Sequence, residues 1–111
     1  MSSTTITRGN SHETFYIQPT LANGSNTLAA NTTTAVTYAI PGLQTTDIVV
    51  MLGLNGSQTA GVVIAEADCL TAGNLTVQYG NLTSNASLTP ASGVYTIQVT
   101  RLEGPAPVTA V

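Results

Sequence analysis

Alternation of apolar and polar residues is the feature that most limits how this chain can fold. In residues 75–79 Leu, Val and Tyr alternate with Thr and Gln, and an apolar run precedes them at residues 62–65. Residues 71–74, a short Thr-Ala-Gly-Asn connection, separate the two segments. A repeat of two places successive side chains on opposite faces of a β-strand. Residues 59–83 are therefore predicted to contain a β-hairpin.

The same format of short strand and small polar turn recurs along the chain, without helical periodicity. Further strands are predicted at residues 14–18, 33–40, 47–52 and 93–102. The run 47–52 is apolar at every position after Asp47, as expected for a strand covered on both faces. We therefore predict an all-β fold, a single β-sandwich or jelly-roll-like domain. Its predicted core consists of Val36, Tyr38, Ile48, Val50, Val62, Ile64, Leu75, Val77, Ile97 and Val99.

The chain length of 111 residues suits one domain with one core. Residues 1–13 are polar and are predicted to form a flexible N-terminal arm. The β-sandwich domain is predicted at residues 14–103. Residues 104–111 contain two prolines and are predicted to form an extended C-terminal tail. The polar connection 20–32 is long for a compact domain, which makes it a candidate contact segment together with the arm.

Charged residues are scarce in this sequence. Asp, Glu, Lys and Arg make up 6% of the chain, where about 25% is typical, and the two cations are Arg8 and Arg101. With a net charge of −3 and no basic patch, we expect neither nucleic acid nor an anionic membrane as partner. A Thr- and Asn-rich surface can lie against another protein without burying charge. Strand propensity also explains the Thr content, but not the absence of Lys.

Targeting and modification signals give little further guidance. Residues 1–10 lack the apolar region of a signal peptide, and no apolar run approaches the length of a membrane span. Glycosylation triplets are expected by chance in so Asn- and Thr-rich a chain. They begin at Asn23, Asn31, Asn55, Asn74, Asn81 and Asn85.

Groups suited to catalysis are few. His12, the sole histidine, lies beside Glu13 in the predicted arm, and Cys69, the sole cysteine, follows Asp68 without a basic neighbour. We predict that the histidine is a solvated arm residue and that the cysteine is a small buried hydrophobe. No catalytic, cofactor-binding or metal-binding residue is assigned, and we do not expect an enzyme.

Two carboxylates, Glu66 and Asp68, are two residues apart and should share one face of a strand. With Asp47 or Glu103 nearby they could hold a calcium ion or serve as an acid/base pair. Alternatively, the two carboxylates lie on the solvent-exposed face of the strand and only keep that face soluble. A third interpretation pairs them with one of the two arginines.

Four strand-and-turn motifs follow one another in the C-terminal two thirds of the chain. They are DIVVMLG from Asp47, GVVIAEA from Gly61, TAGNLTVQYGNLT from Thr71 and TPASGVYTIQV from Thr89. Together they resemble small virion proteins of tailed bacteriophages, the capsid decoration or head cement proteins. One departure is Glu66, at a position where many relatives carry an arginine. A contact that this arginine makes in the relatives therefore cannot be transferred to this chain.

The resemblance implies an all-β protein, often a homotrimer, that binds the outer surface of the phage head where capsomers meet. It therefore implies localisation in the virion, the major capsid protein as partner, and stabilisation of the shell against internal DNA pressure. Two alternatives stay open at this stage. One is a tail- or fibre-associated module that binds a host receptor, and the other is a secreted glycan-binding β-sandwich.

Overall fold

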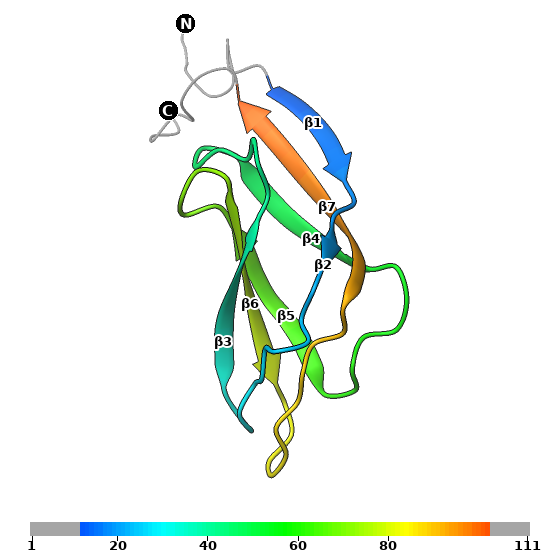
Figure 1. Ribbon diagram of the computed structural model, residues 1–111. Coiled ribbons are helices and arrows are strands. Elements are labelled where there is room, and N and C mark those ends of the chain that lie inside the picture. Colours follow the sequence, from blue (N-terminus) through cyan, green and yellow to red (C-terminus); the bar gives the residue numbers. More distant parts are fainter. Residues whose placement is uncertain (1–11, 103–111) are drawn as a thin grey trace, which may run out of the picture.

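Two antiparallel β-sheets lie face to face in the computed structural model, which describes residues 12–102 (Figure 1). The strands are β1 (His12–Ile17), β2 (Thr20–Leu21), β3 (Thr33–Ala39), β4 (Ile48–Leu54), β5 (Val62–Asp68), β6 (Asn74–Asn81) and β7 (Gly93–Leu102). This arrangement confirms the predicted all-β sandwich.

The first sheet is built around β7. β1 pairs with one edge of β7, and β4 pairs with the other edge. β2 continues β1 in the same register, because Ile17 lies opposite Ile97 and Thr20 opposite Val94. β1 and β2 therefore act as one edge strand that is interrupted at Pro19, a residue that has no amide proton for a ladder.

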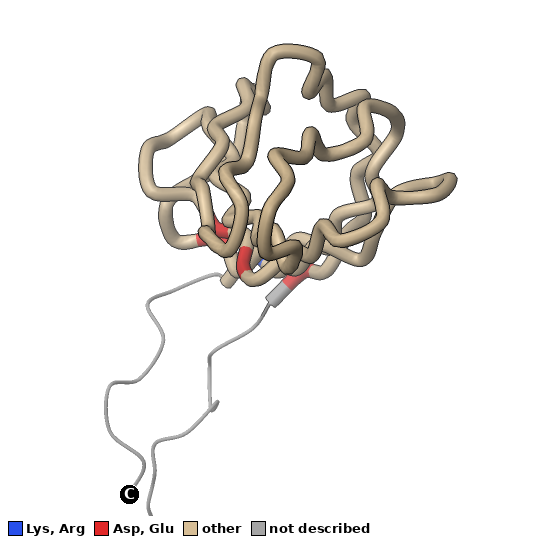
Figure 2. Tube along the Cα trace, turned by 90° about the horizontal axis from the view of Figure 1, so that it is seen from below, with Lys and Arg blue, Asp and Glu red and all other residues tan. Residues whose placement is uncertain are grey.

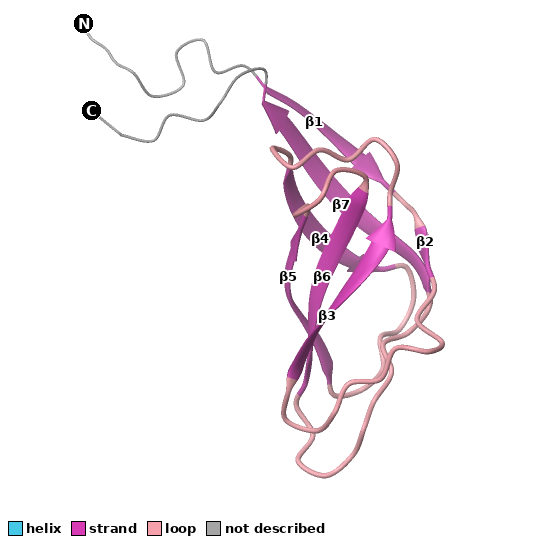
Figure 3. Cartoon of the chain, turned by 60° about the vertical axis from the view of Figure 1, so that its left-hand side comes forward, coloured by secondary structure: helices cyan, strands magenta, loops and turns pink. Residues whose placement is uncertain are grey.

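The second sheet has the order β3-β6-β5. Figure 3 shows it lying in front of the sheet around β7. β5 and β6 form the hairpin predicted from residues 59–83, and β5 contains a bulge between Ile64 and Glu66. β3 pairs with β6 without interruption from Thr33 to Ala39. Since β3 and β5 both pair with β6, they are the two edges of this sheet.

The core lies between the inward faces of the two sheets. Most of the predicted core residues are there: Val36, Tyr38, Val62, Leu75, Val77, Ile97 and Val99 are buried, and Ile64 is half-buried. Other members of this core were not among the predicted residues, although Cys69 was separately predicted to be buried. These are Leu21, Leu28, Leu43, Val49, Cys69, Tyr79 and Tyr95.

Ile48 and Val50 were predicted to lie in the core, and this prediction is wrong. Their side chains are 51% and 46% exposed, while Val49 points into the core and Met51 packs against it. The prediction that the run 47–52 is covered on both faces is wrong for the same reason. Within residues 12–102 no further layer packs on the outer face of β4, so only alternate residues of the run are covered.

The N-terminal boundary also differs from the prediction. β1 begins at His12, which lies opposite Leu102, and Glu13 lies opposite Arg101. Residues 12 and 13 therefore belong to a strand and not to the arm. The rest of the predicted arm, residues 1–11, and the predicted tail lie outside the described residues.

The connection 20–32 enters the interior of the sandwich at the end opposite to the start of β1 (Figure 1). Leu28 and Asn23 are fully buried, and the backbone amide and carbonyl of Leu28 both bond to Leu88. The Tyr38 hydroxyl donates to Asn23 Oδ1 at 2.5 Å and lies 2.7 Å from the Tyr79 hydroxyl. Because the Tyr38 proton is directed to Asn23, Tyr79 donates to Tyr38.

This buried chain of hydrogen bonds predicts different costs for removing its two hydroxyls. In Tyr38→Phe the Tyr79 hydroxyl loses its partner, so we expect a loss of about 2 kcal/mol in the free energy of unfolding. In Tyr79→Phe the Tyr38 hydroxyl still donates to Asn23, so the loss should be about 1 kcal/mol. Urea unfolding of both variants measures the difference. Equal losses, or a larger loss for Tyr79→Phe, would contradict this account.

Candidate docking surface

The two carboxylates singled out in the sequence share one face, as predicted. Glu66 lies opposite Gln78 and Asp68 opposite Thr76 on the outer face of the β3-β6-β5 sheet. Glu66 is exposed, and Asp68 is half-buried, with an Oδ1 atom that has no partner within the described part of the chain. Across residues 12–102, no three His, Cys, Asp or Glu side chains lie close enough to hold a metal ion.

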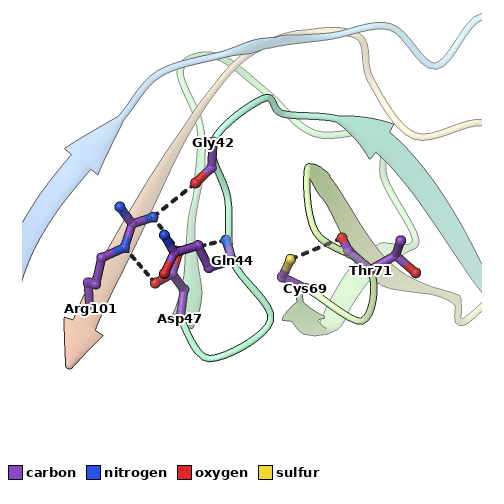
Figure 4. A network of polar contacts seen from close by, with 6 residues as sticks. All are labelled: Gly42, Gln44, Asp47, Cys69, Thr71 and Arg101. Atoms are coloured by element: carbon purple, nitrogen blue, oxygen red, sulfur yellow. Dashed lines mark hydrogen bonds and ion pairs between the residues drawn. The ribbon is translucent and has the colours of Figure 1, made fainter. Parts of the chain in front are cut away.

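Asp47 pairs with Arg101 and not with the two carboxylates of β5 (Figure 4). Arg101 donates from Nε to Asp47 Oδ1 at 2.8 Å and from Nη2 to Oδ2 at 2.7 Å. Nη2 also donates to the Gly42 carbonyl at 3.1 Å, and the guanidinium lies 5.4 Å from the centre of the Phe15 ring. The interpretation that pairs Glu66 or Asp68 with Arg101 is therefore wrong, while Arg8 and Glu103 lie outside the described residues.

This ion pair links the β3–β4 connection, which passes from one sheet to the other, to the C-terminal end of β7. The guanidinium of Arg101 lowers the pKa of Asp47 through its hydrogen bonds, and the Gln44 amide lowers it further at 2.9 Å from Oδ2. Burial opposes these effects, since the Asp47 side chain is completely covered. Asp47 in turn raises the pKa of Arg101. The pair thus has a structural role and leaves neither charge free for a ligand.

The remaining candidates for chemistry are located as follows. His12 begins β1. Cys69 is 4% exposed, and its Sγ donates to the Thr71 carbonyl at 3.2 Å (Figure 4), so the prediction of a buried cysteine is confirmed. Burial raises the pKa of the Tyr38 and Tyr79 hydroxyls, which keeps both protonated in the interior. Tyr38 bonds to Asn23 and Tyr79, and Cys69 bonds to a backbone carbonyl, so these contacts are structural.

An exposed apolar surface covers the outer face of β1, β7 and β4, and we call it the apolar sheet face. It contains Tyr16, 63% exposed, and Leu52, 52% exposed, together with the exposed Ile48 and Val50. Tyr16, Gln98 and Val50 form one row across the three strands, because both outer residues pair with Gln98. Thr14, Thr96 and Thr100 fill the space between the apolar side chains.

The apolar sheet face contains no charged residue, whereas the opposite outer face contains Glu66 and Asp68. The segments 14–46, 48–65 and 69–100 have no charge at all. Figure 2 shows that the acidic residues gather on one side of the trace and leave the rest uncharged. Sequence reasoning missed this face because the run 48–52 is apolar at every position and gives no register. Only the exposure of alternate residues identifies it.

Cavities add no stronger candidate. A shallow groove of about 250 Å³ between β4 and β5 is lined by residues 49–51 and 64–67, and Glu66 is the sole titratable residue among them. Binding sites for small molecules usually combine an apolar lining with several convergent polar groups. In the part of the chain that the structure describes, no helix is long and apolar enough to cross a bilayer.

Neither a protein-family model, nor a curated protein, nor a solved structure matches this chain. The resemblance to capsid decoration proteins therefore stays a prediction.

The ion pair predicts how stability changes in acid. The pKa of folded Asp47 lies below the value of about 3.9 expected in the unfolded chain. Its contribution is therefore present above about pH 4 and is lost as the pH falls through the lowered value. We expect Asp47→Asn to melt at a lower temperature than the wild type at pH 7. The difference should shrink below pH 4.

Melting temperatures between pH 7 and pH 2 measure this effect. Glu66→Gln is the matched control, because it removes an exposed carboxylate without an ion pair, and its melting curve should follow the wild type. A difference between Asp47→Asn and the wild type that is the same at pH 7 and pH 2 would contradict the assignment.

Proposed function

We propose that this chain is a structural virion protein, a decoration protein that binds the outer surface of a phage head at capsomer junctions. The observation that supports the proposal most is the apolar sheet face, with large exposed side chains and no charge. Monomeric proteins rarely leave a large contiguous apolar patch uncovered unless it binds something. The proposed partner is the major capsid protein, which Tyr16, Val50 and their neighbours would contact.

The energetics of such a contact favour a flat, neutral surface. Burial of apolar area contributes roughly 25 cal/mol per Å² before the costs of association are subtracted. Those costs are reduced here because the exposed side chains belong to paired strands, whose backbone is already ordered. No charge of the apolar sheet face has to be desolvated, and the threonine hydroxyls can bond to the partner or to water.

The mechanism is physical and requires no reacting group. Packaged DNA pushes capsomers apart, and a protein bound across their junction adds contacts that must break before they separate. A protein that binds the assembled shell but not free subunits shifts the equilibrium toward the shell. Many copies on a repeating lattice strengthen this effect through multivalency.

The alternative functions have weaker support. A secreted glycan-binding module should tolerate glycosylation. It is disfavoured because Asn23 and Asn81 are 0% and 2% exposed, so two of the triplets cannot accept a glycan in the folded protein. Tyr16 is the single exposed tyrosine within residues 12–102, which is a small platform for a sugar. A tail or fibre module would use the same face for a receptor, and its location in the virion distinguishes it.

The N-terminal arm is a second proposed contact with the shell. Because His12 and Glu13 pair with β7, a deletion that tests the arm alone must stop at residue 11.

Charge on the apolar sheet face should weaken shell binding if the proposal is right. Val50→Glu places a carboxylate at the middle of the face, where contact would remove it from water. We expect at least about a tenfold loss of affinity for decoration-free shells of the cognate phage, measured by co-sedimentation. The decorated shells should also lose their added resistance to heat.

Ala72→Glu is the matched control, since Ala72 is an exposed residue in the β5–β6 turn. It makes the same change of charge away from the face and should bind like the wild type. Circular dichroism checks that both variants fold. Equal binding by the two variants would exclude the apolar sheet face as the contact. Wild-type protein that does not bind expanded shells would overturn the proposed function.

A further inference from the structure

Within residues 12–102, three of the four sheet edges contain features that discourage pairing with another strand. The β1–β2 edge has the charge of Glu13 at one end and Pro19 within it. The β5 edge has a bulge after Ile64 and the carboxylates Glu66 and Asp68. The β4 edge has a bulge at Leu52, and β4 packs beside β5. Charges, prolines and bulges are the devices by which natural proteins protect their free edges.

The β3 edge has none of these features. Residues 33–39 contain no charge and no proline, and they pair with β6 in an unbroken register. Among the described residues, β6 is the one strand that β3 pairs with, so the backbone groups along its other edge have no strand partner. An edge of this length without protection is a template for a further strand.

We infer that β3 pairs with β3 of a second copy of this chain, antiparallel and about a two-fold axis. The sequence of the strand suits this self-pairing. With the axis at Val36, Ala35 faces Thr37 of the second copy, and Thr33 faces Ala39 of the second copy. These pairs are small and neutral, and like charges, which would oppose pairing, are absent from residues 14–46.

A second copy fits this edge better than it fits the others. Self-pairing through β5 would bring four carboxylates together, and self-pairing through β4 would meet a bulge in each strand. Pairing through β3 joins two three-stranded sheets into one six-stranded sheet. It leaves the apolar sheet face free, because that face belongs to the other sheet.

This inference goes beyond the proposed function and does not depend on it. It gives a dimer, whereas the resemblance to decoration proteins implies a trimer. The mass in solution therefore tests the inference, and shell binding tests the proposed function separately.

The experiment measures the mass of the full chain by sedimentation equilibrium at increasing protein concentration. We expect a monomer–dimer equilibrium with a monomer of 11.3 kDa. Ala35→Lys combined with Thr37→Lys places like charges along the paired edges. The dissociation constant of this variant should rise at least about tenfold. Hydrogen exchange supplies the second readout: the amides of residues 33–39 that point away from β6 should be protected in the dimer and exchange faster in the variant.

Two control variants separate pairing from net charge and from folding. Thr45→Lys with Ser57→Lys makes the same change of charge at exposed loop residues, and Ala35→Ser with Thr37→Ser keeps the edge neutral. Both should dimerise like the wild type, and amides of β6 should stay protected in every folded variant. A monomeric wild type, a trimer, or a dimer unaffected by the lysines on β3 would overturn the inference.

Discussion

The fold depends on hydrogen bonds between neutral groups that are buried at one end of the sandwich. Tyr38 joins Tyr79 to Asn23, and the Asn23 amide donates to the Ala91 carbonyl at 3.1 Å. That carbonyl also accepts the Tyr95 hydroxyl, to which Gln58 donates at 2.9 Å. These bonds connect both sheets with the long connections that close this end. A buried polar group left without a partner is costly, so the network selects one arrangement of these loops.

The few charges of the described residues lie at one buried contact and on strands at sheet edges. At the opposite end of the sandwich, the ion pair between Asp47 and Arg101 links the β3–β4 connection to β7. The hydrogen bonds from Arg101 lower the pKa of the Asp47 carboxyl. Glu13 and the two carboxylates of β5 lie on strands at sheet edges. Charge is thus used for one structural contact and for protection of edges. As a consequence, the apolar sheet face and the β3 edge have no electrostatic barrier to contact.

Local periodicity predicted the strands, because alternation is a property of neighbouring residues. It also predicted that Glu66 and Asp68 share a face. It could not predict which residues of the run 48–52 point outward, because every position is apolar and the register is set by pairing with β7. The pairing of Asp47 with Arg101 joins residues 54 positions apart, which no local pattern encodes. The burial of Asn23 was missed because a residue in a polar connection is expected to be exposed. Its buried hydrogen-bond partners come from distant parts of the chain and leave no local pattern.

A small domain can provide several contacts at once if its surfaces are separated in space. The apolar sheet face belongs to the sheet around β7, and the β3 edge belongs to the other sheet. A partner on one does not cover the other, so self-pairing and shell binding do not compete. Because a dimer presents two apolar sheet faces, its second contact on a lattice would be intramolecular and favoured by effective concentration. The two proposals therefore reinforce each other energetically, although each stands on a different set of residues.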